Sequence, residues 1–169
     1  AMGQGTNSYS NVGRSCYVAA IANSGTVFDL SLLDKMTDSE GNLIKDFTPE
    51  ATGHVDIADS TWDAVHQGMR AVITDGSVSK IFKDLEVEIA GKTGTAQESR
   101  TRGNHAFFIS YGPYTNPEIC VTVNIPYGYS SSNAAMVAKN VYRFYYGYTD
   151  LESILGSGAL EVSNVKVGD

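Results

Sequence analysis

The sequence predicts an α+β fold in which an antiparallel sheet is flanked by helices. Three segments, at residues 88–97, 105–111 and 119–125, alternate apolar and polar side chains as strands do. Three other segments keep apolar residues at helical spacing between helix start and stop signals. Strands that follow one another in the chain pair in one sheet, and helices outside that run cover its faces. We therefore expect, in chain order, helix, hairpin, helix, three strands and helix.

The composition is that of one globular domain. With 169 residues the chain can bury a single core, and 42% hydrophobic against 18% charged residues excludes the disordered class. The net charge of −7 argues against nucleic acid or an anionic membrane as a partner. No apolar run approaches the roughly 20 residues of a membrane-spanning helix. The first residues do not have the pattern of a signal peptide.

The first helix is expected between Ser10, a good N-cap, and Gly25, which stops it. Its spaced residues, expected on one face, are Val12, Cys16, Ala19, Ala20 and Asn23. A β-hairpin should follow, with strands at 27–36 and 43–47 around a turn at 38–42 that is rich in Asp, Ser, Gly and Asn.

Residues 48–59 are polar and are expected to be irregular, after which Ser60 should cap a second helix that ends at Asp75-Gly76. The residues expected along its core face are Trp62, Val65, Met69, Val72 and Ile73. A third helix should begin after 129–132. Its inner face is expected to carry Met136, Val137, Asn140, Val141, Phe144 and Tyr145. Periodicity is lost beyond Gly147, so we expect residues 148–169 to be a flexible tail.

The segment at 88–97 carries the most distinctive chemistry. Gly91 and Gly94 remove side chains where a ligand or another backbone has to come close. Lys92 supplies a cation, while Thr93 and Thr95, two residues apart, place both hydroxyls on one face of a strand. A cation, two hydroxyls and backbone N–H groups beside glycine suit a carboxylate next to a carbonyl. That pattern occurs at the end of a peptide and in a β-lactam.

The stretch Ala90-Gly-Lys-Thr-Gly-Thr-Ala-Gln97 resembles the third motif of the penicillin-binding proteins and serine β-lactamases. The aromatic strand His105-Ala-Phe-Phe-Ile-Ser-Tyr111 and the later Pro117-Glu-Ile-Cys-Val-Thr-Val123 narrow the resemblance to the class B transpeptidases. Further segments stand in the order of that family: Met2-Gly-Gln-Gly5, Ile21-Ala-Asn-Ser-Gly-Thr26 and Gly128-Tyr-Ser-Ser-Ser-Asn-Ala-Ala135. The resemblance covers residues 1–147, which we expect to be the C-terminal part of a transpeptidase domain.

The resemblance implies roles for the motif residues. Lys92 would hydrogen-bond a serine of an S-x-N motif and supply positive potential. Thr93, Gly94 and Thr95 would bind the substrate, with the two threonines on its carboxylate and the Thr95 N–H forming half of an oxyanion hole. The partners implied are D-Ala-D-Ala stem peptides of peptidoglycan, β-lactams and the cell-wall synthesis machinery, with no cofactor, at the extracytoplasmic face of the membrane.

The resemblance also implies that the nucleophile is outside this chain, because the family places S-x-x-K and S-x-N before K-T-G. Two short look-alikes occur, Ser77-Val-Ser-Lys80 and Ser131-Ser-Asn133. Ser77 lies only 15 residues before Lys92, and Ser131 follows it, so we interpret Ser77 as a turn or cap residue and Ser131 as part of a helix N-cap. We therefore expect a fragment that is inactive alone and lacks the N-terminal half of its domain.

Two other functions stay open from the sequence. A β-lactam-sensing receptor has the same kind of domain but signals instead of cross-linking, and the chain could also be a non-catalytic binding module. Cys16 and Cys120 are interpreted as small core residues in preference to a disulfide. His54, His66 and His105 share no ligand spacing, so no metal site is expected.

Overall fold

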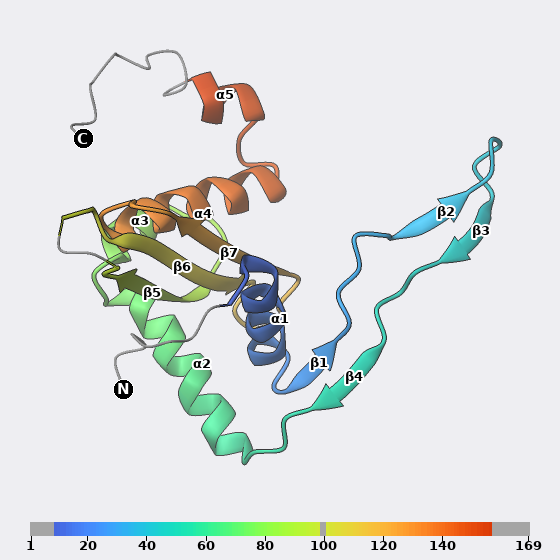
Figure 1. Cartoon of the computed structure of the whole chain (residues 1–169), viewed down its shortest axis with the longest axis horizontal. Coiled ribbons are helices and arrows are strands. Elements are labelled where there is room, and N and C mark those ends of the chain that lie inside the picture. The colour runs from blue at the N-terminus through green and yellow to red at the C-terminus, as the bar shows by residue number, and fades with distance from the viewer. Residues whose placement is uncertain (1–8, 99–100, 157–169) are drawn as a thin grey trace.

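A three-stranded antiparallel sheet lies at the centre of the structure, a computed structural model that describes residues 9–98 and 101–156 (Figure 1). Its strands are β5 (Ala90–Ala96), β6 (His105–Gly112) and β7 (Ile119–Ile125), in that spatial order. The three predicted strands are confirmed, although β5 is shorter than expected. Helices cover both faces of the sheet, so the predicted α+β class is also confirmed.

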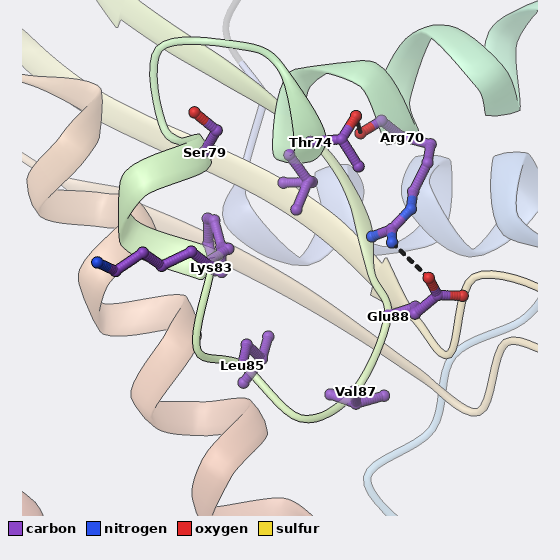
Figure 2. Close-up of a pocket in the computed structure, with 9 residues that line it drawn as sticks. Arg70, Thr74, Ser79, Lys83, Leu85, Val87 and Glu88 are labelled. Atoms are coloured by element: carbon purple, nitrogen blue, oxygen red, sulfur yellow. Dashed lines mark hydrogen bonds and ion pairs between the residues drawn. The ribbon is translucent and has the colours of Figure 1, made fainter.

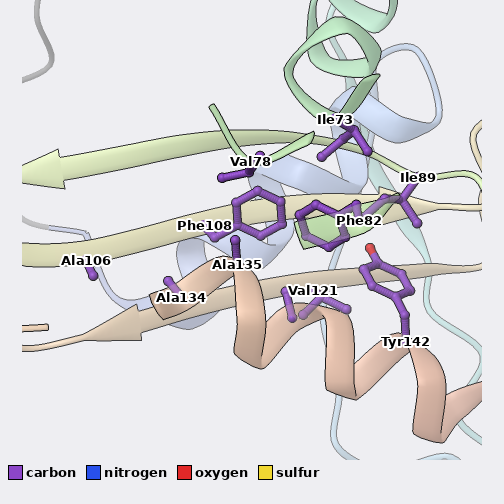
Figure 3. Close-up of a cluster of buried hydrophobic side chains, with 11 residues drawn as sticks. Ile73, Val78, Phe82, Ile89, Ala106, Phe108, Val121, Ala134, Ala135 and Tyr142 are labelled. Atoms are coloured by element: carbon purple, nitrogen blue, oxygen red, sulfur yellow. The ribbon is translucent and has the colours of Figure 1, made fainter. Parts of the chain in front are cut away.

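The first face of the sheet is covered by α3 (Ser79–Phe82) and α4 (Ser131–Tyr145). Figure 3 shows Phe108 of β6 and Val121 of β7 pointing into this cluster, which Tyr142 of α4 also enters. Phe82 and Phe108 stack at 5.4 Å between ring centroids. The short helix α3 was not predicted.

The inner face of α4 differs from the prediction. Met136, Val137 and Phe144 are exposed, and the buried residues of the helix are Ala134, Ala135, Ala138 and Tyr142. Alanines let the helix axis come close to a sheet face that already carries large side chains. Both sides of this helix have apolar residues at helical spacing, so periodicity alone selected the wrong side.

A buried polar chain connects α4 to the sheet. The Tyr142 hydroxyl donates to Ser110 Oγ at 3.0 Å, and Ser110 Oγ donates to the Val121 carbonyl at 3.3 Å. Burial raises the pKa of Tyr142. Both side chains are fully buried, and the chain of bonds satisfies hydroxyl groups that would otherwise be costly there.

The second face of the sheet is covered by α1 (Asn11–Ala22) and most of α2 (Asp59–Thr74). The predicted cap of α1 is confirmed, since Ser10 Oγ accepts from the Gly13 N–H at 3.0 Å. Its predicted face is only partly right, because Val12 and Asn23 are exposed. The buried residues of α1 are Val18, Ala20, Ile21 and Ala22.

The second helix starts one residue before the predicted cap. Its N-cap is Ala58, which makes no side-chain bond, and Ser60 lies inside the first turn. Trp62 and Met69 are buried as predicted and pack on the second face, while Val65 is exposed and Ile73 contributes to the first face. The helix therefore spans both layers beside the start of β5.

The predicted hairpin is part of a longer ribbon that projects away from the sheet and helices (Figure 1). Its outer ladder pairs β2 (Lys35–Thr37) with β3 (Leu43–Asp46), and its inner ladder pairs β1 (Thr26–Phe28) with β4 (Ala51–His54). The expected single strand at 27–36 is thus two strands, separated by residues 29–34, which belong to neither ladder. Residues 51–54, expected to be irregular, form β4.

The end of the described chain is helical. Residues Leu151–Gly156 form the six-residue helix α5, inside the segment expected to be a flexible tail, and residues 157–169 lie outside the described part. Within the described ranges, none of the helices combines the length and the apolar character required to cross a bilayer.

Candidate active site

The strand β5 has a strand neighbour on one side only among the described strands, and this strand carries the predicted site residues. Residues directly opposite each other in an antiparallel pair share a face of the sheet. Thr93 is opposite Phe108 and Thr95 is opposite Ala106, so both hydroxyls lie on the α4 side. The predicted placement of the two threonines on one face is confirmed.

Lys92 lies on the other face of the strand. It is opposite Ile109, which packs against the cluster under α1 and α2. Its Nζ donates to the carbonyl of the next residue, Thr93, at 2.8 Å, so the ammonium group lies against the backbone of its own strand. The cation and the two hydroxyls therefore flank the unpaired side of β5 from opposite faces. A ligand that bonds to this strand would lie between them.

The glycines of the motif differ in what they make room for. A Cβ at Gly91 would lie 2.7 Å from Phe108 Cζ and 2.9 Å from the Ile109 carbonyl, so only glycine fits there. A Cβ at Gly94 would be 3.3 Å from Phe107 Cβ, a tight contact that a small shift relieves. Gly91 is thus required by the sheet and its core, while Gly94 leaves the strand slim where Lys92, Thr93 and Thr95 are displayed.

An arginine of α2 fixes the start of the strand. Arg70 donates from Nη1 to the Ile89 carbonyl at 2.8 Å and from Nη2 to Glu88 Oε1 at 2.7 Å. Its guanidinium also lies over the Tyr114 ring, 5.7 Å from the centroid. Sequence reasoning missed this contact, because Arg70 and Glu88 are 18 residues apart and nothing in either segment pairs them.

The same ion pair forms one wall of a pocket between α2, α3 and the segment leading to β5 (Figure 2). The volume of this pocket is about 300 Å³. Apolar side chains of Ile73, Phe82, Leu85 and Val87 line much of the rest. The residues that line the pocket do not include Lys92, Thr93 or Thr95, so the pocket is separate from the motif.

A polar network lies at the far end of β5. Glu98 Oε2 is 2.9 Å from His105 Nε2, and the Tyr127 N–H donates to His105 Nδ1 at 3.2 Å. With Nδ1 accepting from the Tyr127 N–H, Nε2 is the ring nitrogen that donates to Glu98. The hydrogen bond from His105, followed by one from Tyr127, lowers the pKa of Glu98.

Arg102 completes this network by donating to the Tyr127 hydroxyl at 2.9 Å. Tyr127 and Tyr129 both have positive φ, so the turn after β7 holds an uncommon backbone shape. Sequence reasoning missed this network, because it depends on the register between β5 and β6. His105 stands opposite Ala96 in the ladder, which brings the flanks of the intervening loop together.

The two serine look-alikes are placed as interpreted. Ser77 is an exposed turn residue between α2 and α3. Ser131 begins α4, whose N-cap is the preceding Ser130, with Oγ accepting from the Ser132 N–H at 3.3 Å. Asn133 uses its side chain to bond the Gly128 carbonyl at 2.8 Å.

Both cysteines are free and half-buried. Burial raises the pKa of Cys120 to about 11, which keeps it a thiol. In the part of the chain that the structure describes, no group of three or more His, Cys, Asp or Glu residues is arranged to hold a metal ion.

Comparison with known proteins gives consistent matches. The family model described as the penicillin binding protein transpeptidase domain matches residues 1–143. The peptidoglycan D,D-transpeptidase MrdA of Haemophilus influenzae is 36% identical over 103 residues, which cover 51% of this chain and 16% of that protein. Penicillin-binding protein 2A of Bacillus subtilis is 30% identical over 131 residues, covering 69% of this chain and 18% of that protein.

Solved structures agree with these matches. Penicillin-binding protein 2B of Streptococcus pneumoniae superposes with a TM-score of 0.73 at 25% identity, covering 85% of this chain and 25% of that one. For PBP2 of Pseudomonas aeruginosa the TM-score is 0.68 at 32% identity, and the match covers 85% of this chain and 32% of that one. The chain spans less than a fifth of the length of the curated relatives it matches.

Proposed function

We propose, from the premise that this chain belongs to the class B penicillin-binding protein transpeptidase family, that the protein containing it is a peptidoglycan D,D-transpeptidase. It would cross-link cell-wall peptides by serine acyl transfer from D-Ala-D-Ala stem peptides. β-Lactams would acylate the same serine. The domain would extend over residues 1–147, with 148–169 as a tail, at the extracytoplasmic face of the membrane among the cell-wall synthesis machinery.

One observation carries this proposal. Lys92, Thr93 and Thr95 lie on a strand that has a strand partner on one side only within the described residues, with the cation on one face and both hydroxyls on the other. An acyl donor that ends in a carboxylate can extend along such a strand, because hydroxyls and a cation favour its charge and backbone groups bind its carbonyl.

Each motif residue has a distinct role in the proposed reaction. The Lys92 ammonium raises the positive potential of the site and bonds the serine of an S-x-N motif. The hydroxyls of Thr93 and Thr95 hold the substrate carboxylate. The Thr95 N–H stabilises the oxyanion of the tetrahedral intermediate, a contribution of about 2.7–4 kcal/mol to the barrier where such donors have been removed.

The nucleophile would come from a part of the protein outside these 169 residues. Ser77 lies in a turn and Ser131 starts α4, and neither side chain makes a contact with Lys92 among the hydrogen bonds of the described residues. The chain by itself is accordingly expected to be inactive.

The test is the Lys92→Ala change in the full natural protein, followed by intact mass after incubation with benzylpenicillin. Acylation should slow by about 10²–10³-fold. Lys45→Ala, a change of the same type in the projecting ribbon, should leave the rate unaltered. Unchanged acylation of Lys92→Ala would refute the assignment of the strand. A penicillin adduct on the 169-residue chain alone would contradict the external nucleophile.

A β-lactam receptor is separated from the enzyme by turnover. Relatives named as D,D-transpeptidases support the enzyme. An enzyme releases D-alanine repeatedly from a D-Ala-D-Ala peptide when an acceptor amine is present, whereas a receptor or a binding module does not. A single acylation without turnover would favour the receptor.

A further inference from the structure

Residues 29–57 form most of the projecting ribbon, which we call the arm. Backbone hydrogen bonds between its two sides hold it together, including Phe47 N to the Asp34 carbonyl at 2.9 Å and Asp29 N to the Glu50 carbonyl at 3.1 Å. Apart from Phe47, which is half-buried, all of these residues are exposed, and none belongs to either core cluster. A two-stranded ribbon without a packed face is marginally stable in water, so this element needs a surface to lie on.

The side chains of the arm are unusually apolar for an exposed element. Leu32 is fully exposed, and Leu33, Leu43 and Ile44 are each about 60% exposed. The complete set of its large exposed apolar residues is Leu30, Leu32, Leu33, Met36, Leu43, Ile44, Val55 and Ile57. A concentration of this kind on one projecting element marks a surface that other molecules cover.

The arm also carries most of the net negative charge of the chain. It contains seven carboxylates and two lysines, a net charge of −5 out of −7 for all 169 residues. Among the described residues, the ion pairs within 4 Å involve none of these carboxylates. The negative charge of these carboxylates is therefore not neutralised by an ion pair within the described residues, and it is available to attract a positively charged partner.

The base of the arm is firmly attached to the domain. The Val55 N–H donates to the Gly25 carbonyl at 2.9 Å. Gly25 has φ +116°, and a Cβ there would lie 2.7 Å from the Val55 carbonyl oxygen and 3.1 Å from the Trp62 ring. This position admits only glycine. The arm thus leaves the core in a set direction, which suits an element that presents a surface.

We propose that the arm docks on a different protein, in an apolar groove bordered by lysine and arginine. The exposed leucines supply the buried centre of such an interface and the carboxylates supply its rim. Charge disfavours two other occupants, because a second arm and an anionic lipid surface are both negative and would repel it. A segment of the natural protein outside these 169 residues is a further occupant, and the experiment below distinguishes it from a different protein. This inference does not depend on the chemistry proposed for Lys92 and its neighbours.

The experiment places a photo-reactive benzoylphenylalanine at position 32 of the full natural protein in its own cells. Cross-linked peptides are identified by mass spectrometry, with half of the copies isotope-labelled so that contacts between copies are recognised. We expect a peptide of another protein that contains more lysine and arginine than aspartate and glutamate.

A second variant tests the charge. Asp34→Asn, Glu40→Gln and Glu50→Gln together should lower the cross-link yield on the order of tenfold. The matched control, Asp63→Asn, Glu86→Gln and Glu152→Gln, changes three exposed carboxylates outside the arm and should leave the yield within about twofold. Thermal unfolding of each purified variant reports that the domain is folded.

Several results would overturn the proposal. They are a cross-link to another part of the same chain, to a second copy, to lipid or to an acidic segment, or no cross-link at all. A yield that the arm variant does not lower would also overturn it, because the carboxylates would then have no part in docking. The cross-linking results do not depend on whether Lys92→Ala slows acylation. The docking proposal and the proposed function can therefore fail independently of each other.

Discussion

The central sheet and the arm are both antiparallel β-structure in one chain, but different forces hold them. Phe108 and Val121 of the sheet are buried under α3 and α4, whereas the strands of the arm are exposed along their whole length. The sheet gains stability from removing apolar surface from water. The arm has mainly its ladder hydrogen bonds, each of which contributes little net free energy.

This difference explains where each proposed function lies. A site that has to hold a reacting group in one geometry needs a strand fixed from behind, as β5 is by Arg70 and by the packing of Ile89. A docking element needs accessible apolar and charged groups instead, which the arm has. The following predictions test the contrast from the largest expected effect to the smallest.

Removal of a large apolar side chain should separate the two regions most strongly. Phe108→Ala leaves a cavity beside Phe82 and should cost about 3–5 kcal/mol. Leu32→Ala in the arm removes a side chain that is already in water and should change stability by no more than about 0.5 kcal/mol. Hydrogen exchange of β6 and β7 amides in the natural protein measures both. Similar losses would mean that the arm is packed on something in the isolated protein.

Adding one methyl group should give a smaller contrast. Gly91→Ala forces a carbon against Phe108 and the Ile109 carbonyl, and should cost about 1–3 kcal/mol. Gly53→Ala in β4 meets nothing within 4 Å and should be neutral within about 0.5 kcal/mol. The same exchange measurement applies. A tolerant Gly91→Ala would show that the sheet shifts easily behind the motif.

Deleting a hydroxyl should matter only where water cannot replace it. Tyr142→Phe removes a buried bond to Ser110 and should cost about 1 kcal/mol. Thr52→Val in the arm removes an exposed bond to the Val27 carbonyl, and solvent compensates for the loss, so almost no change is expected. Thermal unfolding of each purified variant compares the two. An equal shift of the midpoint would contradict the contrast.

The two regions should also respond to opposite extremes of pH. Burial raises the pKa of Tyr111 from 10.0 to about 12 in the folded protein. The folded state holds this proton more tightly than the unfolded state, so the contribution is complete below pH 10 and is lost as pH rises towards 12. The change in Trp62 fluorescence on unfolding measures the stability at each pH. The Tyr111→Phe variant should lose less stability than the natural protein as pH rises from 10 towards 12.

At the tip of the arm the sign is reversed. The pKa of Asp38 lies below 3.8, chiefly because the Asn42 side chain and then the Asn42 N–H donate to its carboxylate. Order in this turn is present above pH 3.8 and is lost as pH falls below the lowered value. The Asn42 amide signal followed by NMR in acid measures it. Asp38→Asn should make the signal insensitive to acid; a transition that persists would assign the acid response to another group.

The candidate site was predicted more fully than its surroundings. Local spacing was enough to place Thr93 and Thr95 on one face, because the period of a strand is two. It was not enough to pair Arg70 with Glu88 or His105 with Glu98 and Tyr127, since these contacts follow from which segments fold together. The prediction of which face of α4 is buried was wrong for a related reason. Alanines face the sheet there because the space is small, and the larger apolar residues are left outside.

The sequence by itself determined the α+β class, the N-cap at Ser10 and the motif at 90–97, because these depend on short-range periodicity and on glycine, serine and lysine at fixed spacing. Only the tertiary structure decided that Ala134 and Ala138 face the core and that the arm projects with its leucines exposed. Side-chain burial depends on which distant segments share a space, and that information lies in the packing of the whole chain.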